Sequence, residues 1–308
     1  MIIRSHFAHH AKNRFLFAFS IALIACFIAS PARTSSFSTE SVGFTSSPRG
    51  HLLVPVSIDG SEPLVFVLDT GAGKTSVTPS LAERLGLEEV PGESASTLGV
   101  HGKTENPIVK LQSIAVGGAL LENVNGIVLD LEHITRGAWH VDGILGMDFL
   151  TQFDVQLDFK ASQVSFFSAA SSRSGCVACP EGIDGIGFDT IDPGFIVLPA
   201  TLDAKPVSAV LDSGSGHSGI NINAATALGV SIPPMPPGTA AGHGFGLQTG
   251  PLLLGNETLS ERATLHVMDH PVMESLGLAN RPTMLLGTDQ LQDRTVTICY
   301  GLETLFVL

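Results

Sequence analysis

A short motif that occurs twice is the feature of this sequence that most restricts its fold. Residues 63–72 read PLVFVLDTGA and residues 206–215 read PVSAVLDSGS. Each copy is an apolar run ending in Val-Leu, followed by an aspartate, a hydroxyl residue and a glycine. Asp69 and Asp212 are 143 residues apart (212 − 69). Because two copies of a motif indicate two copies of a structural unit, the sequence predicts a chain built from two similar repeats.

Two further pairs of segments repeat with nearly the same spacing. Residues 81–87 (LAERLGL) match 224–230 (AATALGV) at an offset of 143 (224 − 81). Residues 144–150 (ILGMDFL) match 285–291 (LLGTDQL) at an offset of 141 (285 − 144). An offset that changes so little requires loops of nearly equal length in the two copies. The two repeats are therefore predicted to share one fold.

Patterns typical of β-strands dominate each repeat. Apolar residues alternate with polar ones or run continuously over short segments, as they do in half-buried and buried strands. In the first copy these segments are 52–58, 64–68, 108–116, 125–131 and 153–159. The sequence predicts an all-β fold in which each repeat forms a β-barrel lobe.

A short helix is expected after each repeated aspartate. Thr78 or Asn223 can cap its start, because a side-chain oxygen there accepts a hydrogen bond from a free backbone N–H. Gly86 or Gly229 can end it, because glycine adopts the left-handed conformation that closes many helices. Helices are therefore expected only as short interruptions of the β structure.

Composition and length agree with two β lobes. The chain has 308 residues, of which 44% are hydrophobic and 15% charged, with 33 glycines and 18 prolines. These values argue for a turn-rich globular protein and against disorder. We expect an N-terminal lobe at 41–168, a linker rich in Ser, Gly and Cys at 169–184, and a C-terminal lobe at 185–308.

The first residues have the pattern of an export signal. Basic residues without an acidic partner precede the apolar run 15–29, and small residues follow it. We expect residues 1–32 to be a signal peptide and the protein to be exported, to the periplasm or out of the cell. Two alternatives remain open: a membrane tether through an acylated Cys26, which ends a lipoprotein-like Leu-Ile-Ala-Cys box, and an uncleaved anchor.

The charge balance disfavours one class of partner. Three of the 16 basic residues lie in the signal segment, so 13 remain against 29 acidic residues, a net charge of −16 (13 − 29). A strongly acidic chain repels phosphate backbones, and nucleic acid is not expected as a partner.

Three cysteines remain after the signal segment. Cys176 and Cys179 form a Cys-x-x-Cys pair in the linker, and Cys299 lies in a strand pattern. We expect a local Cys176–Cys179 disulfide in an oxidising compartment, with Cys299 buried. A zinc site would need a fourth ligand, which the sequence does not offer.

The repeated aspartate suits a shared catalytic site. Each follows a buried strand that fixes its loop, and the nearby glycine lets another backbone approach. If the loops face each other across a pseudo-twofold axis, the two carboxyls lie too close to ionise together and share one proton. The ionised member can take a proton from water while the protonated member donates one to a carbonyl oxygen. These steps hydrolyse a peptide bond without a covalent intermediate.

On these motifs the chain resembles the aspartic peptidases of the pepsin and retropepsin type, over roughly residues 50–308. Members carry two apolar residues, Asp, Thr or Ser, and Gly in each lobe, and later two apolar residues and a Gly that packs beside that loop. Both elements occur twice here, in order. The resemblance implies two pepsin- or retropepsin-like lobes related by a pseudo-twofold axis, with neither metal nor cofactor.

The resemblance also implies roles for individual residues. Asp69 and Asp212 correspond to the catalytic pair, and Gly146 and Gly287 to the structural glycines. Residues that support the pair would be Thr70 and Ser213, bonded to each other across the axis, Gly71 and Gly214, presenting backbone amides, and Ser215, bonding its neighbouring aspartate. Ala72 takes the place of Ser215 in the first copy, as in retropepsins, which would make the two halves inequivalent.

Family members cover the site with a β-hairpin flap. Here it is expected around residues 97–104, and its substrate-binding tip would comprise Gly99, His101 and Gly102. The pepsin pattern has a tyrosine at the flap, which is absent here, because the only tyrosine is Tyr300. Gly242, His243 and Gly244 stand at the equivalent place of the second copy. They suggest two flaps, as in a retropepsin dimer.

Other polar residues are given structural roles. Asp148 and Asp289 follow the Leu-Gly element of each copy and are interpreted as caps or surface acids. His266 and His270 have the spacing of metal ligands on a helix, but the residues between them have a strand and turn pattern, so no metal is assigned.

Three functions fit this sequence. The first is a single-chain aspartic endopeptidase that cleaves a peptide or protein substrate, a monomer whose lobes pair within the chain. The second is a non-catalytic peptide-binding protein that keeps the cleft, which the intact carboxylates of both copies disfavour. The third is a homodimer in which each repeat pairs with its counterpart in another molecule. The difference between Ala72 and Ser215 favours pairing within one chain.

Overall fold

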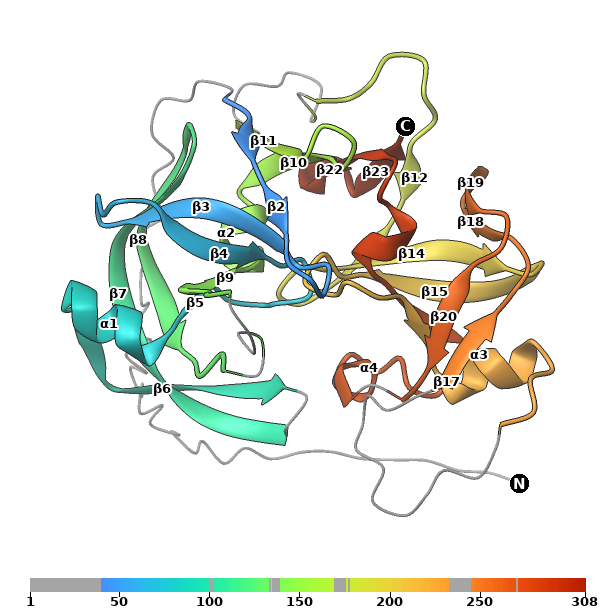
Figure 1. Cartoon of the computed structure of the whole chain (residues 1–308), viewed down its shortest axis with the longest axis horizontal. Helices are drawn as coiled ribbons and strands as arrows, with labels where there is room; N and C mark the ends of the chain where they lie inside the picture. Colours follow the sequence, from blue (N-terminus) through green and yellow to red (C-terminus); the bar gives the residue numbers. More distant parts are fainter. Residues whose placement is uncertain are drawn as a thin grey trace, which may run out of the picture. The chain divides into compact units, whose positions relative to one another are not determined.

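The computed structural model describes residues 40–308 except 100–101, 133, 135–138, 169–175, 177, 233–244 and 270. All of them belong to one compact unit, Ala32–Leu308. Their structure is mostly β with short helices, as predicted (Figure 1). None of the helices in this part of the chain is long and apolar enough to cross a membrane.

Eight strands of the first repeat form one sheet. They are β2 (Thr45–Ser46), β3 (Leu52–Ile58), β4 (Leu64–Leu68), β5 (Ser76–Val77), β6 (Glu89–Gly99), β7 (Gly102–Val116), β8 (Ala119–Val128) and β9 (Gly143–Leu145). Their order in the sheet is β2-β3-β4-β9-β5-β8-β7-β6. β3 and β4 have the predicted bounds, whereas β8 ends at Val128, before the predicted end at 131.

The second repeat forms a nine-stranded sheet. Its strands are β13 (Asp189–Ile191), β14 (Phe195–Leu202), β15 (Lys205–Leu211), β16 (Gly219–Ile220), β17 (Phe245–Gln248), β18 (Leu252–Leu254), β19 (Glu257–Ser260), β20 (Thr264–Val267) and β21 (Thr283–Leu286). Its centre repeats that of the first sheet. β4 runs parallel to β9 as β15 runs parallel to β21, and β5 and β16 each pair antiparallel with that second strand.

A third sheet takes strands from both repeats, which the sequence analysis did not predict. Its six strands are β1 (Val42–Gly43), β10 (Phe153–Asp158), β11 (Gln163–Ser168), β12 (Ile186–Gly187), β22 (Thr295–Cys299) and β23 (Thr304–Val307). The repeats join where β10 pairs antiparallel with β22, with Val155 opposite Ile298. The backbone hydrogen bonds of this pair connect the two halves directly.

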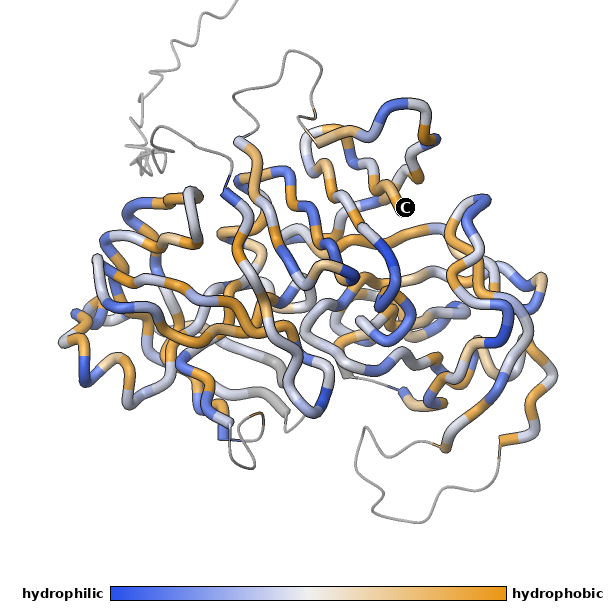
Figure 2. Tube along the Cα trace, turned by 45° about the horizontal axis from the view of Figure 1, so that its top comes forward, coloured by the Kyte–Doolittle hydropathy of each residue, from blue (hydrophilic) through white to orange (hydrophobic). Residues whose placement is uncertain are grey.

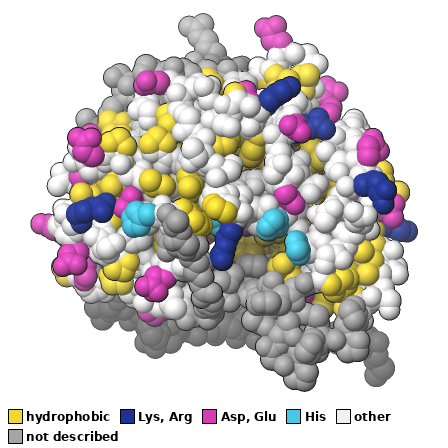
Figure 3. All heavy atoms as spheres, viewed as in Figure 1, with side chains coloured by type: hydrophobic (Ala, Val, Ile, Leu, Met, Phe, Trp, Pro, Cys, Tyr) yellow, Lys and Arg dark blue, Asp and Glu magenta, His cyan; other side chains and the backbone are white. Residues whose placement is uncertain are grey.

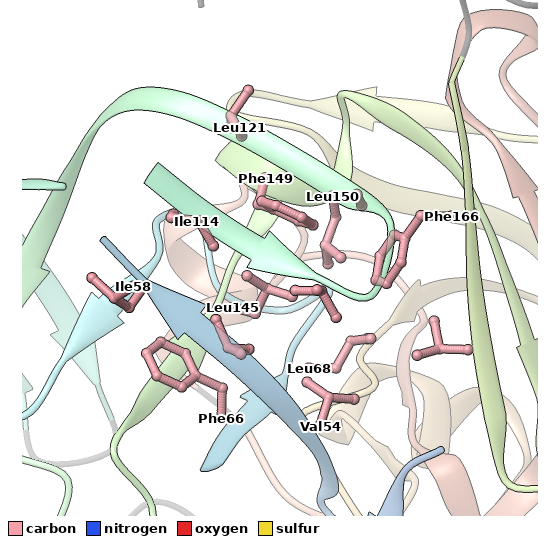
Figure 4. Packing of buried hydrophobic residues seen from close by; sticks show 14 of the residues in the cluster. Val54, Ile58, Phe66, Leu68, Ile114, Leu121, Leu145, Phe149, Leu150 and Phe166 are labelled. Carbon is pink, nitrogen blue, oxygen red and sulfur yellow. The ribbon is translucent and has the colours of Figure 1, made fainter. Parts of the chain in front are cut away.

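Each repeat has its own hydrophobic core. Along β3 the alternate residues Leu52, Val54, Val56 and Ile58 point inward, as the two-residue period of a strand requires. Figure 2 shows the same alternation of hydrophobic and hydrophilic residues along other strands. Figure 4 shows the first core, where side chains from β3, β4, β7, β9 and β11 meet those of a short helix. The partly buried Phe159 and Tyr300 pack against both cores.

The helix after the first aspartate forms as predicted. α1 (Pro79–Leu85) begins at Thr78, whose side chain accepts a hydrogen bond from the Leu81 N–H, and ends at Gly86 in the left-handed conformation. The other short helices are α2 (Met147–Leu150), α3 (Ile222–Ala227), α4 (Pro271–Ser275) and the 3-10 turns η2 (Thr288–Gln290) and η3 (Tyr300–Leu302).

The predicted cap of the second helix needs a correction. Asn221, not Asn223, caps α3, because its side-chain oxygen accepts a hydrogen bond from the Ala224 N–H at 2.8 Å. Asn223 lies inside the helix and donates to the Ala279 carbonyl at 2.7 Å. Gly229 has a φ of 76° just after the helix, in agreement with its predicted role at the exit.

The predicted disulfide is wrong. Cys176 is bonded to Cys299, at the end of β22, and Cys179 is an exposed free thiol. Cys179 Sγ lies 3.9 Å from Cys299 Sγ. The short spacing of Cys176 and Cys179 favoured a local bond, but the third sheet brings Cys299 to the segment between the repeats. The disulfide therefore connects that segment to a strand of the second repeat.

This pairing predicts the outcome of peptide mapping. Alkylation of the native protein, followed by acidic non-reducing digestion, should give a crosslinked Cys176–Cys299 peptide and an alkylated Cys179, because of these three cysteines only Cys179 is a free, exposed thiol. Cys179→Ser should leave the crosslink unchanged. A Cys176–Cys179 peptide with alkylated Cys299 would contradict the structure.

The surface agrees with the acidic composition. On the face shown in Figure 3, acidic side chains are scattered widely, and Lys and Arg side chains do not gather into a continuous patch.

Candidate active site

The two predicted aspartates occupy equivalent positions. Asp69 follows β4 and its N–H donates to the Leu145 carbonyl at 3.1 Å. Asp212 follows β15 and its N–H donates to the Leu286 carbonyl at 3.0 Å. In each repeat, the strand that runs parallel to the aspartate's own strand, β9 or β21, therefore bonds to the start of the aspartate's loop. Leu145 and Leu286 belong to the Leu-Gly elements that the sequence repeats.

A reciprocal set of hydrogen bonds joins the two loops. The Thr70 N–H donates to Ser213 Oγ at 3.0 Å, and the Ser213 N–H donates to Thr70 Oγ1 at 2.9 Å. Thr70 Oγ1 in turn donates to the Leu211 carbonyl at 3.0 Å, and Ser213 Oγ donates to the Leu68 carbonyl at 2.9 Å. Both hydroxyl side chains are buried. Each loop thus bonds to the strand that carries the other loop's aspartate, in the way the resemblance implied.

The glycines of the motif let the two loops meet closely. The Gly71 N–H donates to Asp69 Oδ1 at 2.7 Å. A Cβ on Gly71 would lie 2.6 Å from Asp212 Oδ1, and a Cβ on Gly214 would overlap the carboxyl of Asp69. Each glycine therefore stands against the carboxyl of the other repeat, and no larger residue fits there. The structure brings Asp69 and Asp212 together at one centre.

Burial and mutual charge set the ionisation of the two carboxyls. Both keep some accessible surface, while most of their surroundings are protein. Burial raises the pKa of both, and the charge of Asp69 raises the pKa of Asp212 further, well above its usual value. The pKa of Asp69 rises less, because the Gly71 N–H and a hydrogen bond from Asp212 favour its charged form. The pair therefore shares one proton over a range of pH.

A second pair of acids, Asp148 and Asp289, accepts hydrogen bonds from residues that follow the two site loops. The Thr75 N–H and hydroxyl donate to Asp148 Oδ1 at 2.8 and 2.7 Å. In the second repeat the Ser218 hydroxyl donates to Asp289 Oδ1 at 2.6 Å. Asp148 is not the surface acid or simple cap that the sequence suggested, since burial raises its pKa. The equal offset of Thr75 and Ser218, 143 residues (218 − 75), was an unused signal of these hydrogen bonds.

The Leu-Gly elements also lie against the site loops. A Cβ on Gly146 would lie 2.5 Å from the Lys74 carbonyl carbon, and one on Gly287 would lie 2.7 Å from that of His217. The Gly146 N–H donates to Thr75 Oγ1 at 3.1 Å and the Gly287 N–H to Ser218 Oγ at 2.9 Å. Both glycines therefore pack beside the site loops.

Ser215 differs from its expected role. Its hydroxyl donates to the His217 carbonyl at 2.8 Å and not to the neighbouring aspartate. The backbone N–H groups of Gly214 and Ser215 favour the charged form of Asp212. The Ser215 hydroxyl, which Ala72 lacks, therefore makes no hydrogen bond to the carboxyl pair.

A turn from each repeat packs against the loop of the other. In the first turn, a Cβ on Gly50 would lie 2.6 Å from Gly216 Cα, and the Thr288 hydroxyl donates to the Gly50 carbonyl at 3.0 Å. The second turn contains Pro193, whose Cγ would lie 2.8 Å from a Cβ on Gly73 in the loop of the first repeat. The first turn also carries His51 to the site, a residue that sequence reasoning missed because no motif marks it.

The predicted flap region contains a hairpin. β6 and β7 pair with Gly99 opposite Gly102, so the hairpin ends at the predicted place. His101 at its tip lies outside the described residues, as do Gly242, His243 and Gly244 of the second copy. Their contact with substrate stays a prediction.

The other candidate metal ligands are His266, His270 and the three cysteines. His266 lies in β20 with its ring 5.6 Å from that of His217, and His270 lies outside the described residues. In the part of the chain that the structure describes, only Cys176, Cys179 and Cys299 bring three potential ligand atoms within 4.8 Å of one another. Two of them form the disulfide, so no metal ligand set is assigned.

Comparison with known proteins supports an aspartyl protease family. Residues 54–149 match the family described as aspartyl protease. The match runs from β3 to α2 and includes Asp69 with the first Leu-Gly element. Asp212 lies outside it. No curated protein matches the chain.

Proposed function

We propose that this protein is an aspartic endopeptidase whose single site is formed by Asp69 and Asp212. The observation that carries the proposal is the meeting of two motif carboxyls, one from each repeat, between loops bonded reciprocally through Thr70 and Ser213. A peptide-binding scaffold would not need two adjacent carboxyls that destabilise each other's charge. An acid–base pair that shares one proton needs this arrangement.

In this proposal the two carboxyls have different roles. Asp69, ionised, takes a proton from a water molecule, whose oxygen attacks the carbonyl carbon of the scissile peptide bond. Asp212, protonated, donates its proton to the carbonyl oxygen. The tetrahedral intermediate then collapses as the leaving nitrogen takes a proton from the pair, and the C–N bond breaks. The products are a free carboxyl group and a free amine.

The organisation of the chain belongs to the same proposal. The lobes at 41–168 and 185–308 would pair within one molecule, so the active species would be a monomer. Residues 1–32 would direct export, which places the substrate among peptides or proteins outside the cytoplasm.

Peptide hydrolysis tests the proposed function. The purified protein should cleave a mixed peptide library between pH 3 and 7, with an acid optimum, because activity requires Asp69 ionised and Asp212 protonated. A statine-type peptide, which resembles the tetrahedral intermediate, should abolish cleavage. Folded protein that binds this inhibitor and peptides but cleaves none would support the non-catalytic binding protein instead.

A further inference from the structure

One imidazole, that of His51, bonds to the loop that carries Asp212. His51 directly precedes β3, and its Nδ1 lies 2.6 Å from the Gly214 carbonyl oxygen. Because a carbonyl oxygen can only accept, Nδ1 carries the proton of this hydrogen bond. The ring is half-buried and lies 5.8 Å, centroid to centroid, from the indole of Trp139. Its position is therefore fixed by both a hydrogen bond and packing.

The bond from His51 ends on a residue that lies against Asp69. A Cβ on Gly214 would overlap the carboxyl of Asp69. His51 thus contacts the machinery without touching either carboxyl.

The other half of the site lacks this group. The residue 143 positions after His51 is Gly194 (194 − 51), which has no side chain. A Cβ built there would meet the side chains of Thr151 and Met147. The environments of the two carboxyls therefore differ, although their loops are built alike.

The charge of His51 is coupled to Asp69. Burial lowers the pKa of His51 below its usual value, although its bond to Gly214 and the negative charge of Asp69 act in the opposite direction. The other charged groups that act on it are Arg49, on its own turn, and His217, on the opposite loop, and both lower its pKa. In return, the imidazolium lowers the pKa of Asp69. His51 is not among the main influences on the pKa of Asp212.

We propose that His51 is a positioning residue that makes Asp69, and not Asp212, the ionised member of the pair, and keeps it ionised further into acid solution. The inference rests on the proposed function. Its physical basis is that a positive charge held on the Asp69 side favours the anion there. His51 would thereby set which carboxyl activates water.

The pH profile of cleavage is the first test. The acid limb of kcat/KM reports protonation of Asp69 in the free enzyme. His51→Gln keeps an N–H that can reach Gly214 but cannot carry charge, so the pKa of Asp69 rises and the acid limb moves up by about one pH unit. The urea midpoint should stay in place, whereas His51→Ala should lower it as well. An unmoved acid limb in His51→Gln overturns the proposal.

His217→Gln is the matched control. This imidazole is exposed on the loop that carries Asp212 and is not among the main influences on the pKa of Asp69. Its removal should displace the acid limb less than His51→Gln does. An equal displacement in both variants would show a general charge effect and would overturn the role of His51.

A second readout is independent of turnover. The titration of the His51 ring, followed by NMR, should shift to lower pH in Asp69→Asn, because the attracting negative charge is lost, and should shift less in Asp212→Asn. Equal shifts, or none, overturn the inference even if the enzyme is active. If the parent protein cleaves no peptide but shows the unequal shifts, the proposed function fails and the coupling of His51 to Asp69 stands.

Discussion

Asp69→Asn and Asp212→Asn should each reduce kcat by about 10²–10⁴-fold or more, the range assigned to a positioned acid or base. Asparagine has nearly the shape of aspartate but cannot ionise or share the proton. Each substitution therefore removes one half of the acid–base pair and leaves the loops in place. Steady-state cleavage of a single peptide from the library, at the pH optimum of the parent protein, measures the loss.

The control for this prediction is Asp189→Asn, at an exposed position on β13. It removes one acidic group of the same kind at a position outside both motifs, and kcat should not change. If only one of the two site variants is inactive, the carboxyls do not act as a shared pair. If both keep more than a tenth of the activity, the site lies elsewhere.

Asp212→Asn should also change how the free energy of unfolding depends on pH. The folded-state pKa of Asp212 is raised above its unfolded value. Its contribution to the free energy of unfolding is therefore fully present below the unfolded pKa and is lost as the pH rises through the folded pKa. Asp212→Asn removes that loss. Urea unfolding should show the variant gaining stability relative to the parent protein as the pH is raised from acid to neutral.

Thr70→Val should lower the free energy of unfolding by roughly 2–6 kcal/mol, because it leaves two buried groups without a partner at about 1–3 kcal/mol each. The Ser213 N–H loses its acceptor and the Leu211 carbonyl loses its donor. Valine has almost the volume of threonine, so packing changes little. Cleavage should fall too, since the two loops lose part of their alignment. Urea denaturation at the pH of maximal stability measures the effect.

Two conservative variants separate this prediction from a general effect of mutation. Thr70→Ser keeps the hydroxyl and should retain most of the stability. Ser215→Ala removes a hydroxyl whose bond to the His217 carbonyl is exposed, and should change stability by less than about 0.5 kcal/mol. A Thr70→Val loss no larger than that of Ser215→Ala would show that the reciprocal bonds contribute little.

The parts of the fold that the sequence predicted have strong local signals. β3 and β4 have regular apolar patterns, and α1 has a cap at Thr78 and a stop at Gly86. The carboxyl pair could be anticipated because its motif is repeated with its spacing. In these cases the residues that determine the structure are close together in the sequence.

The features that were missed depend on contacts between distant segments. Nothing in the pattern of β10 distinguishes β22 as its partner, because many strands of the chain have similar apolar runs. The Cys176–Cys299 bond follows from that pairing and could not be inferred without it. His51 reaches Gly214 across 163 residues through a turn that carries no motif.

The contrast between His51 and Gly194 has an evolutionary consequence. In a symmetric dimer encoded by one short gene, every mutation changes both sides of the axis at once, so neither aspartate can acquire surroundings of its own. Here the two loops are encoded by separate codons of one chain. A mutation can therefore alter the neighbourhood of one aspartate while the other keeps its ancestral setting. Acid and base can then be selected independently, a freedom that a twofold assembly lacks.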